Sequence, residues 1–441
     1  MSAAVVSLLA LVAVVVVSCF SPINIGFLSI ALAFLIGRFL GGLPLSAIVG
    51  GFPASLFLTL AGVTLLFAQS RVNGTLEKVV TRSLRLARGN RGVIPIVFFF
   101  LGVGLATIGA GNIAAVALLA PVAMSVAGRA GISGFLMTLM LANGANAGGL
   151  SPFAPTGIIA RDLMRRVGLV GMEWPNYFNT LLAQSVVAFG GYFLFGGLQL
   201  FSREPAPERR GFTTREGGLG GPESPPSLDS ERGFTPREQD EDPFTPSQYL
   251  TVAVIGALVL CTVLFRTDVG MGAFVGAAIL SFARAADEEA AVKCMPWGVI
   301  LMVCGVTVLV EVISRTGGLD LFTRMLASLS NPATITGVIA LVTGVISVYS
   351  SSSGVVLPTF LPMIPGLVTH LGGGNPLMIA YSINVGAHLV DVSPLSTLGA
   401  LCLAVAAPSE DRRALFRKLM AWGWSMALVG AVVCQLLFGY R

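Results

Sequence analysis

Four short segments combine Gly or Pro with small polar side chains inside runs that are otherwise apolar. They are residues 107–112 (TIGAGN), 143–152 (NGANAGGLSP), 349–354 (YSSSSG) and 384–394 (NVGAHLVDVSP). Gly and Pro interrupt a helix, and an interruption frees backbone N–H and C=O groups. Away from water, such groups persist only where they line a cavity or pack against protein. The four segments are therefore the candidate binding site.

The chemistry that these segments support is the binding of an anion together with a small cation. They hold no Lys or Arg, so an anion must be held by the N–H groups that begin each following half-helix and by hydroxyl and amide donors. The residues predicted to bind a substrate anion are Asn112, Asn143, Asn146, Ser151, Ser351, Ser352, Ser353, Ser393 and Thr397. Freed carbonyl groups and side-chain oxygens suit an alkali ion. The residues predicted to form the ion site are Gly109, Gly111, Asn112, Gly148, Ser350, Gly354, Asn384 and Asp391.

Asp391 is the only acidic residue between Met325 and Ala407, and His388 lies three residues before it. A carboxylate inside a long apolar region is costly and indicates an ion or proton site. The alternative is that Asp391 caps the half-helix that begins near Ser393. A metal site on this pair has no third ligand in the sequence. We therefore expect no resident cofactor, and Na⁺ or H⁺ as the coupling ion.

The chain around these segments is too apolar to form one water-soluble core. Hydrophobic residues make up 54% of its 441 residues, charged residues make up 11%, and the mean hydropathy is +0.84. Uncharged stretches long enough to cross a bilayer, which takes about 20 helical residues, occur at 2–37, 39–70, 92–128 and 325–390. Arginines cluster between the apolar segments, which is typical of membrane orientation rather than of nucleic-acid binding. The sequence predicts a multi-pass protein of the inner (plasma) membrane.

The sequence also repeats itself. Pro53 and Gly62 recur 243 residues later as Pro296 and Gly305, and the segment 143–157 recurs at an offset of 242. Chance sharing of Gly, Ala and Val among membrane helices does not explain a near-constant offset over about a hundred residues. We predict an all-α polytopic membrane protein with two inverted repeats, each with five spanning helices, one of them broken, plus a re-entrant helical hairpin.

Three regions follow from this repeat: a first transmembrane repeat at 1–202, a disordered cytoplasmic linker at 203–247 and a second, inverted repeat at 248–441. The linker is rich in Gly and Pro and has ten acidic residues and six arginines between 203 and 246. Placing it in the cytoplasm puts 19 of the 27 Lys and Arg on that side, and both termini are then outside. The predicted helical segments lie near 3–20, 23–41, 45–69, 92–128, 132–168, 175–201, 248–265, 269–285, 295–313, 332–369, 375–407 and 414–438, with an amphipathic surface helix between 74 and 89.

Several runs resemble the bacterial malonate/dicarboxylate carriers, which belong to an ion-transporter superfamily that includes the divalent anion:sodium symporters. These runs are SPINIG (21–26), GFPASLFLTLAGVTLLFAQSRVNGTLEKVV (51–80), ALLAPVAMS (117–125) and NGANAGGLSPFAPTG (143–157). PWGVILMVCGV with TGGLD (296–320) and SPLSTLGAL (393–401) are similar to segments of the same symporters. The resemblance implies an elevator-type secondary carrier of malonate or a C4-dicarboxylate that is ion-coupled and often dimeric.

In those symporters a Ser-Asn-Thr signature at each hairpin tip binds carboxylate and Na⁺. Only Asn112 in the first tip and the serines at 350–353 in the second tip match that signature. The expected partners are a small dicarboxylate, membrane lipid and a second copy of the chain, and no nucleic acid.

Other readings stay open. They are a carrier of citrate, another tricarboxylate or an inorganic anion, a proton-coupled carrier that uses Asp391, and the large membrane subunit of a multi-component uptake system. An enzyme would need a cluster of titratable groups around one cavity, and a single His–Asp pair is too little for most reactions. We therefore expect no enzymatic activity.

Overall fold

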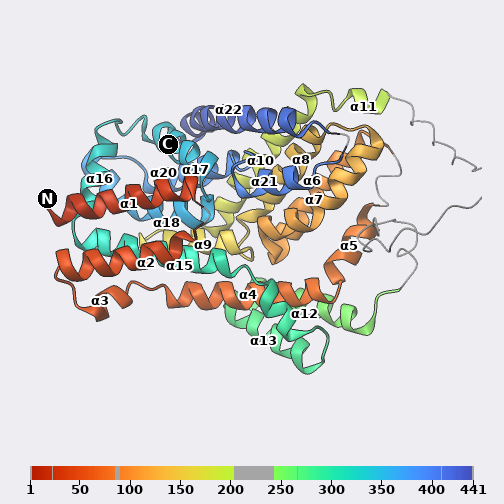
Figure 1. Cartoon of the computed structure of the whole chain (residues 1–441), viewed down its shortest axis with the longest axis horizontal. Helices are drawn as coiled ribbons and strands as arrows, with labels where there is room; N and C mark the ends of the chain where they lie inside the picture. The colour runs from red at the N-terminus through yellow and green to blue at the C-terminus, as the bar shows by residue number, and fades with distance from the viewer. Residues whose placement is uncertain are drawn as a thin grey trace, which may run out of the picture.

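The computed structural model describes residues 2–21, 23–84, 90–202, 243–265, 267–408 and 410–439. These residues form helices and short connections, and no strand occurs among them (Figure 1). The first half contains α1 (Ala3–Phe20), α2 (Ile25–Leu35), η1 (Ile36–Leu40), α3 (Leu45–Val49), α4 (Ala54–Val72), α5 (Thr75–Leu84), α6 (Val93–Leu105), η3 (Ala106–Ala110), α7 (Gly111–Ala130), α8 (Gly134–Gly149), α9 (Pro155–Arg166), α10 (Glu173–Leu194) and α11 (Gln199–Ser202).

The second half contains α12 (Pro246–Phe265), α13 (Val269–Phe282), α14 (Glu288–Cys294), α15 (Trp297–Arg315), α16 (Gly318–Ala327), α17 (Ile335–Tyr349), η4 (Ser352–Val356), α18 (Leu357–Phe360), η5 (Leu361–Met363), α19 (Ile364–Leu371), α20 (Pro376–Leu389), α21 (Thr397–Ala404) and α22 (Arg412–Phe438). Every predicted helical segment overlaps one or more of these helices. Of the predicted linker, only 243–247 are among the described residues. Of the amphipathic segment predicted between 74 and 89, residues 75–84 form α5, and residues 85–89 lie outside the described residues.

Helices long and apolar enough to cross a membrane confirm the predicted helical, polytopic character. Among the described residues there are five such segments: Leu45–Val72, Val93–Ala130, Trp297–Arg315, Ser352–Leu371 and Arg412–Phe438. Shorter apolar helices accompany them.

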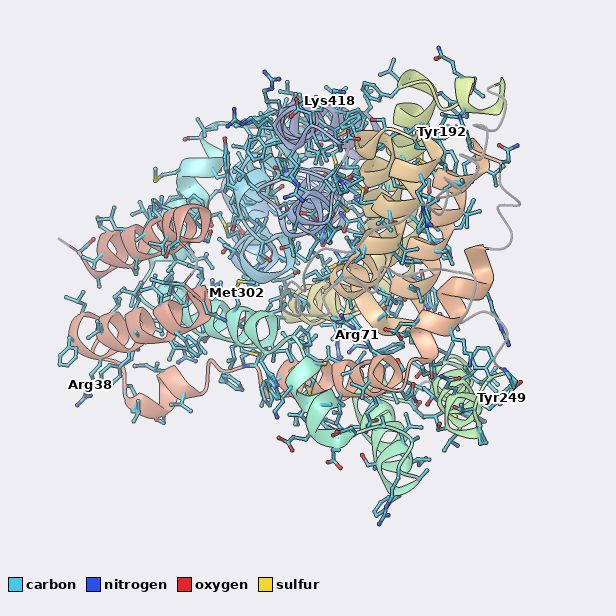
Figure 2. All side chains as sticks on the ribbon, turned by 45° about the vertical axis from the view of Figure 1, so that its right-hand side comes forward. Arg38, Arg71, Tyr192, Tyr249, Met302 and Lys418 are labelled. Atoms are coloured by element: carbon cyan, nitrogen blue, oxygen red, sulfur yellow. The ribbon has the colours of Figure 1, made fainter. Side chains whose placement is uncertain are left out.

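The outer surface of the bundle is apolar. Large side chains such as Leu182 on α10, Val275 on α13 and Leu428 on α22 are exposed, as expected where lipid replaces water. Arg38 and Tyr249 lie on opposite sides of the molecule, and both are exposed (Figure 2).

Two buried helices, α8 and α20, form the centre of the bundle. All of α8 is buried, and so is α20 from Ile379 to Leu389. α8 packs against α6 and α10, while α20 packs against α17 and α22. Glycine permits these close contacts: a Cβ on Gly144 would lie 2.3 Å from the Phe99 carbonyl oxygen, and one on Gly386 would lie 2.7 Å from that of Ala340. Small residues let helix backbones approach in this way inside membranes.

A second group of contacts joins the two halves reciprocally. α4 packs against α13, and α15 packs against α2 (Figure 1). A Cβ on Gly62 would lie 2.4 Å from the Gly270 carbonyl oxygen, and one on Gly305 would lie 2.3 Å from the Gly26 carbonyl oxygen. One helix of each half, α4 or α15, therefore packs closely against a helix of the other half.

Candidate functional site

The two broken helices are tied to the hairpins in matching ways. The first break separates α8 from α9, and the Ser151 hydroxyl there donates to the Thr107 carbonyl oxygen at 2.7 Å. The second break separates α20 from α21, and the Ser393 hydroxyl donates to the Val348 carbonyl oxygen at 3.0 Å. Both serines, predicted as substrate ligands, thus satisfy a carbonyl group near the end of the first hairpin limb.

The first hairpin tip depends on two glycines. Gly109 has φ 126° and Gly111 has φ 80°, which other residues rarely adopt. This turn allows α7 to begin at Gly111, so that Asn112 lies in its first turn. The asparagine side chain is buried, and its Oδ1 accepts from the Ile113 backbone N–H at 3.0 Å.

The second tip is built by serines. α17 ends at Tyr349, and the chain is extended at Ser350 and Ser351. The Ser351 hydroxyl accepts from the Gly354 N–H at 3.1 Å, which fixes the start of η4. Ser352 and Ser353 follow in that first turn, and both are buried.

Asp391 is the centre of the polar network. It is buried, and its Oδ1 accepts from the Ser352 hydroxyl at 2.5 Å and from the Ser396 hydroxyl at 3.0 Å. Its Oδ2 accepts from the Asn146 amide at 3.2 Å. Three side-chain donors therefore converge on the Asp391 carboxyl group.

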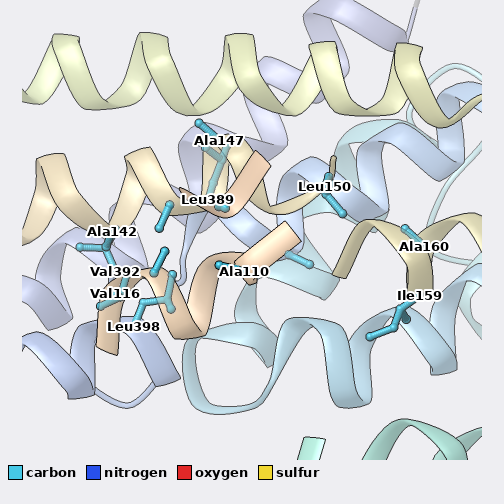
Figure 3. Close-up of a cluster of buried hydrophobic side chains, with 14 of the residues drawn as sticks. Ala110, Val116, Ala142, Ala147, Leu150, Ile159, Ala160, Leu389, Val392 and Leu398 are labelled. Atoms are coloured by element: carbon cyan, nitrogen blue, oxygen red, sulfur yellow. The ribbon is translucent and has the colours of Figure 1, made fainter. Parts of the chain in front are cut away.

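Asn112 extends this network to the first hairpin. Its amide donates to the Asn146 Oδ1 at 2.7 Å, and its own Oδ1 accepts from the Thr156 hydroxyl at 3.3 Å. The chain Asn112–Asn146–Asp391–Ser352 therefore joins both hairpin tips and both broken helices. Buried apolar side chains come from the same helices and breaks, among them Ala147, Leu150, Leu389 and Val392 (Figure 3).

A small pocket opens onto this network. Its lining residues are Asn112, Ile113, Ser351, Ser352, Ser353, His388, Asp391, Ser396, Thr397 and Leu398. Its volume is about 10 Å³, which leaves room for about one water molecule. A larger pocket of about 160 Å³ shares Asn112, Ile113 and Ser353 with it. The two pockets together contain most of the predicted substrate ligands.

Two predicted substrate or ion ligands lie deeper in the helices. The Asn143 amide donates to the Leu139 carbonyl oxygen at 2.8 Å within α8. The Asn384 amide donates to Asn176 Oδ1 at 3.1 Å and to the Ala380 carbonyl oxygen at 3.0 Å. Neither residue lines the small pocket.

Three other predicted ion ligands, Gly148, Ser350 and Gly354, do not line the small pocket. The Ser350 hydroxyl lies 2.8 Å from that of Ser18 on α1. Gly148 is at a helix contact, where a Cβ would lie 2.4 Å from the Val103 carbonyl oxygen. Gly354 faces the side chain of Met302.

His388 and Ser396 line the pocket but are absent from the predicted ligands. The His388 Nδ1 lies 2.7 Å from the Asn384 carbonyl oxygen, which places the proton on Nδ1 in the neutral ring. Its Nε2 is buried and has no hydrogen-bond partner among the described residues. The sequence repeat could have indicated His388 as a ligand, because it lies 242 residues after Asn146, which was predicted as a ligand.

The oxygens of Asp391, Ser352 and Ser396 are hard ligands that suit an alkali ion in transit. The described residues hold no group of three or more His, Cys, Asp or Glu side chains placed to bind a transition metal.

A multi-pass helical bundle with a buried polar site between broken helices defines the class of this chain as a membrane transporter. Residues 1–149 match the family model described as the dicarboxylate carrier protein MatC N-terminus. The match agrees with the family resemblance predicted from the sequence: the first 149 residues are similar to the N-terminal part of dicarboxylate carriers of the MatC type. No curated protein matches the sequence.

Solved transporter structures share the fold. The Alcanivorax borkumensis YdaH transporter, reported to have an unusual topology, is 13% identical; the match covers 90% of this chain and 88% of that one, with a TM-score of 0.51. Neisseria gonorrhoeae MtrF, reported to illuminate a class of antimetabolite efflux pumps, is 12% identical; the match covers 99% and 95% of the two chains, with a TM-score of 0.55. At these identities the likeness concerns the fold alone.

Proposed function

We propose that this protein is a secondary active transporter of a small dicarboxylate, malonate or a C4-dicarboxylate, coupled to Na⁺ or H⁺. The main supporting observation is the hydrogen-bonded chain Asn112–Asn146–Asp391–Ser352, which brings both hairpin tips and both broken helices to one buried pocket. The family match over residues 1–149 supports the substrate class.

The charge of the site explains why an anion needs a coupling ion. The small pocket is lined by hydroxyl and amide donors from Asn112, Ser351, Ser353 and Thr397, but also by the carboxylate of Asp391. A dianion placed beside a buried carboxylate is repelled strongly, because the low dielectric of the interior screens little. A cation or proton bound at Asp391 removes this repulsion. Substrate and cation then bind together, which is the physical basis of symport.

Two further observations support alternating access. A pocket of about 10 Å³ does not hold a dicarboxylate, so one wall must move to admit it. The reciprocal contacts of α4 with α13 and of α15 with α2 support two related repeats around this pocket. We propose that the hairpins and broken helices move together against these helices as an elevator, with the linker on the cytoplasmic side of the inner membrane.

The test is uptake of radiolabelled malonate into proteoliposomes that contain only the purified chain, with imposed Na⁺ or H⁺ gradients. We expect gradient-driven malonate uptake that unlabelled succinate inhibits more strongly than citrate. Absence of uptake by the purified chain would favour the multi-component alternative. Preferential uptake of citrate or an inorganic anion would replace the dicarboxylate assignment.

A further inference from the structure

The larger pocket next to the site contains a positive charge that the four polar segments lack. It lies between α4, α7, α9 and the start of α15, and its volume is about 160 Å³. At one end it reaches Asn112 and Ser353, which also line the small pocket. Among its lining residues Arg71 is the one with a charged side chain. Figure 2 shows Arg71 near the middle of the molecule.

The position of Arg71 follows from the helical period of α4. Thr64, Phe67, Ala68 and Arg71 are spaced three or four residues apart, so they share one face of the helix. All four line the pocket. The first three are buried, while Arg71 at the last turn is exposed. Its guanidinium thus lies at the boundary between water and the pocket.

A purely structural role for Arg71 is the simpler explanation to weigh. A cation at the end of a helix is favourable. Burial raises the pKa of Glu77, and the nearby charge of Arg71 opposes part of that rise. These effects account for a cation near the end of α4. They do not account for its presence in a pocket that continues to the substrate donors.

We propose that the 160 Å³ pocket is an entry subsite for the dicarboxylate, in which Arg71 holds one carboxylate before the substrate reaches Asn112 and Ser353. The inference rests on the proposed function, because it assumes that a dicarboxylate uses the adjoining site. A guanidinium matches a carboxylate with two parallel N–H donors. A second carboxylate of the same molecule then faces the amide and hydroxyl donors at the other end of the pocket.

The subsite belongs to one side of the protein. The residue at the corresponding position of the second repeat, 243 residues later, is Ser314. Arg71 is close in sequence to α5, where the Lys78 ammonium donates to the Pro243 carbonyl oxygen at 2.8 Å, next to the predicted linker. The subsite is therefore assigned to the linker side, and the equivalent position of the second half has a neutral residue.

Cys294 offers a readout of this pocket that does not depend on transport. Its thiol is exposed and lines the pocket. In the purified full-length protein, maleimide labelling of Cys294, identified by peptide mass spectrometry, should slow when malonate occupies the subsite. The Cys294→Ser variant identifies the labelled peptide.

The test compares Arg71→Gln and Arg71→Lys with Arg129→Gln, an exposed arginine at the end of α7 that lines neither pocket. Loss of a hydrogen-bonded charge should raise the malonate concentration for half-protection, and the KM for uptake from the linker side, by about ten- to hundred-fold. Arg71→Lys should raise both values less, because lysine keeps the positive charge but lacks the two parallel N–H donors of the guanidinium. Discrimination between malonate and its monomethyl ester should shrink in Arg71→Gln.

The outcomes separate this inference from the proposed function. If the wild-type protein neither transports malonate nor is protected by it, the proposed function fails. If the wild-type protein transports malonate but Arg71→Gln matches Arg129→Gln in KM and in protection, the entry subsite is wrong. If Arg71→Gln does not fold, as judged by size-exclusion chromatography, the Arg71→Lys variant serves as the test. A KM and a protection by malonate equal to those of the wild-type protein would then overturn the inference.

Discussion

Asn146 and His388 lie 242 residues apart, at corresponding positions of the two halves, and the Asn146 amide donates to the His388 carbonyl oxygen at 2.9 Å. Residues related by a two-fold axis meet only close to that axis. The contact fits our proposal of two related repeats, because it would then lie close to their axis. It also explains how a polar network fits in a buried bundle, because each half satisfies groups of the other.

The first prediction concerns ion coupling through Asp391. Asp391→Asn keeps the size of the side chain but removes its charge and directs an amide toward hydroxyl and amide donors. We expect gradient-driven malonate uptake to fall by at least about tenfold, because removing the partner of hydrogen bonds to a charged group costs about 1.5–3 kcal/mol. Uptake in proteoliposomes with and without the gradient measures this. Asp268→Asn, at the exposed cap of α13, is the control, and full gradient dependence in Asp391→Asn would remove Asp391 from the coupling role.

The second prediction tests the reciprocal packing of the halves. In Gly305→Ala the new Cβ would lie 2.3 Å from the Gly26 carbonyl oxygen, so α15 and α2 must separate. We expect the free energy of unfolding to fall by about 1–3 kcal/mol, measured by thermal unfolding in detergent. Gly256→Ala in α12 is the matched control, because no atom lies within 4 Å of the position that its new Cβ would take. Equal thermal stability of the two variants would contradict the close contact.

The sequence predicts well which segments of the chain form the polar site. It predicts less well which residues of those segments lie at the pocket. The breaks, the hairpin tips and Asp391 were predicted because Gly, Pro and isolated charges stand out against apolar helices. Asn143 and Asn384 share these motifs, yet each bonds within its own helix, and sequence alone does not say how far a residue lies from a break. The sequence did not indicate Arg71 as a ligand, because it lies at the end of an unbroken helix, α4. Its position in the pocket depends on the packing of α4 against other helices.

The third prediction concerns pH and a contact between α16 and α19. Asp320 Oδ1 lies 2.6 Å from His370 Nε2, and Asp320 Oδ2 lies 2.6 Å from the Arg324 guanidinium. The hydrogen bond from His370, followed by the charge of Arg324, lowers the pKa of Asp320 below its ordinary 3.8. Because the pKa of Asp320 is lower in the folded state, its ionised form stabilises the fold. This stabilisation is fully present above the ordinary pKa and is lost as the pH falls through the folded-state pKa.

Thermal unfolding between pH 7 and pH 3 checks this sign. The wild-type protein should be slightly more stable than Asp320→Asn near neutral pH, with a small margin because the pair is exposed. The difference should vanish at the acidic end. A margin that grew with acidification would show that Asp320 titrates in the opposite sense.

The fourth prediction uses the fact that the chain has two histidines. His388 lines the small pocket with a buried Nε2 that has no partner among the described residues, whereas His370 binds Asp320 outside it. This nitrogen is therefore the ring atom that remains to contact a substrate or a coupling ion in the pocket. His388→Gln should therefore lower malonate uptake at every pH, while His370→Gln should leave it unchanged.

The same pair of variants identifies the coupling ion. If H⁺ is coupled through the pocket, His388→Gln should flatten the dependence of uptake on an imposed pH gradient. If Na⁺ is coupled at Asp391, the variant should keep its Na⁺ dependence and lose only apparent affinity for malonate. Uptake measured against each gradient separately decides between the two. Equal uptake by wild type and His388→Gln under both gradients would show that the unpaired imidazole nitrogen takes no part in binding, and the donors of Asn112 and the serines would then have to hold the substrate alone.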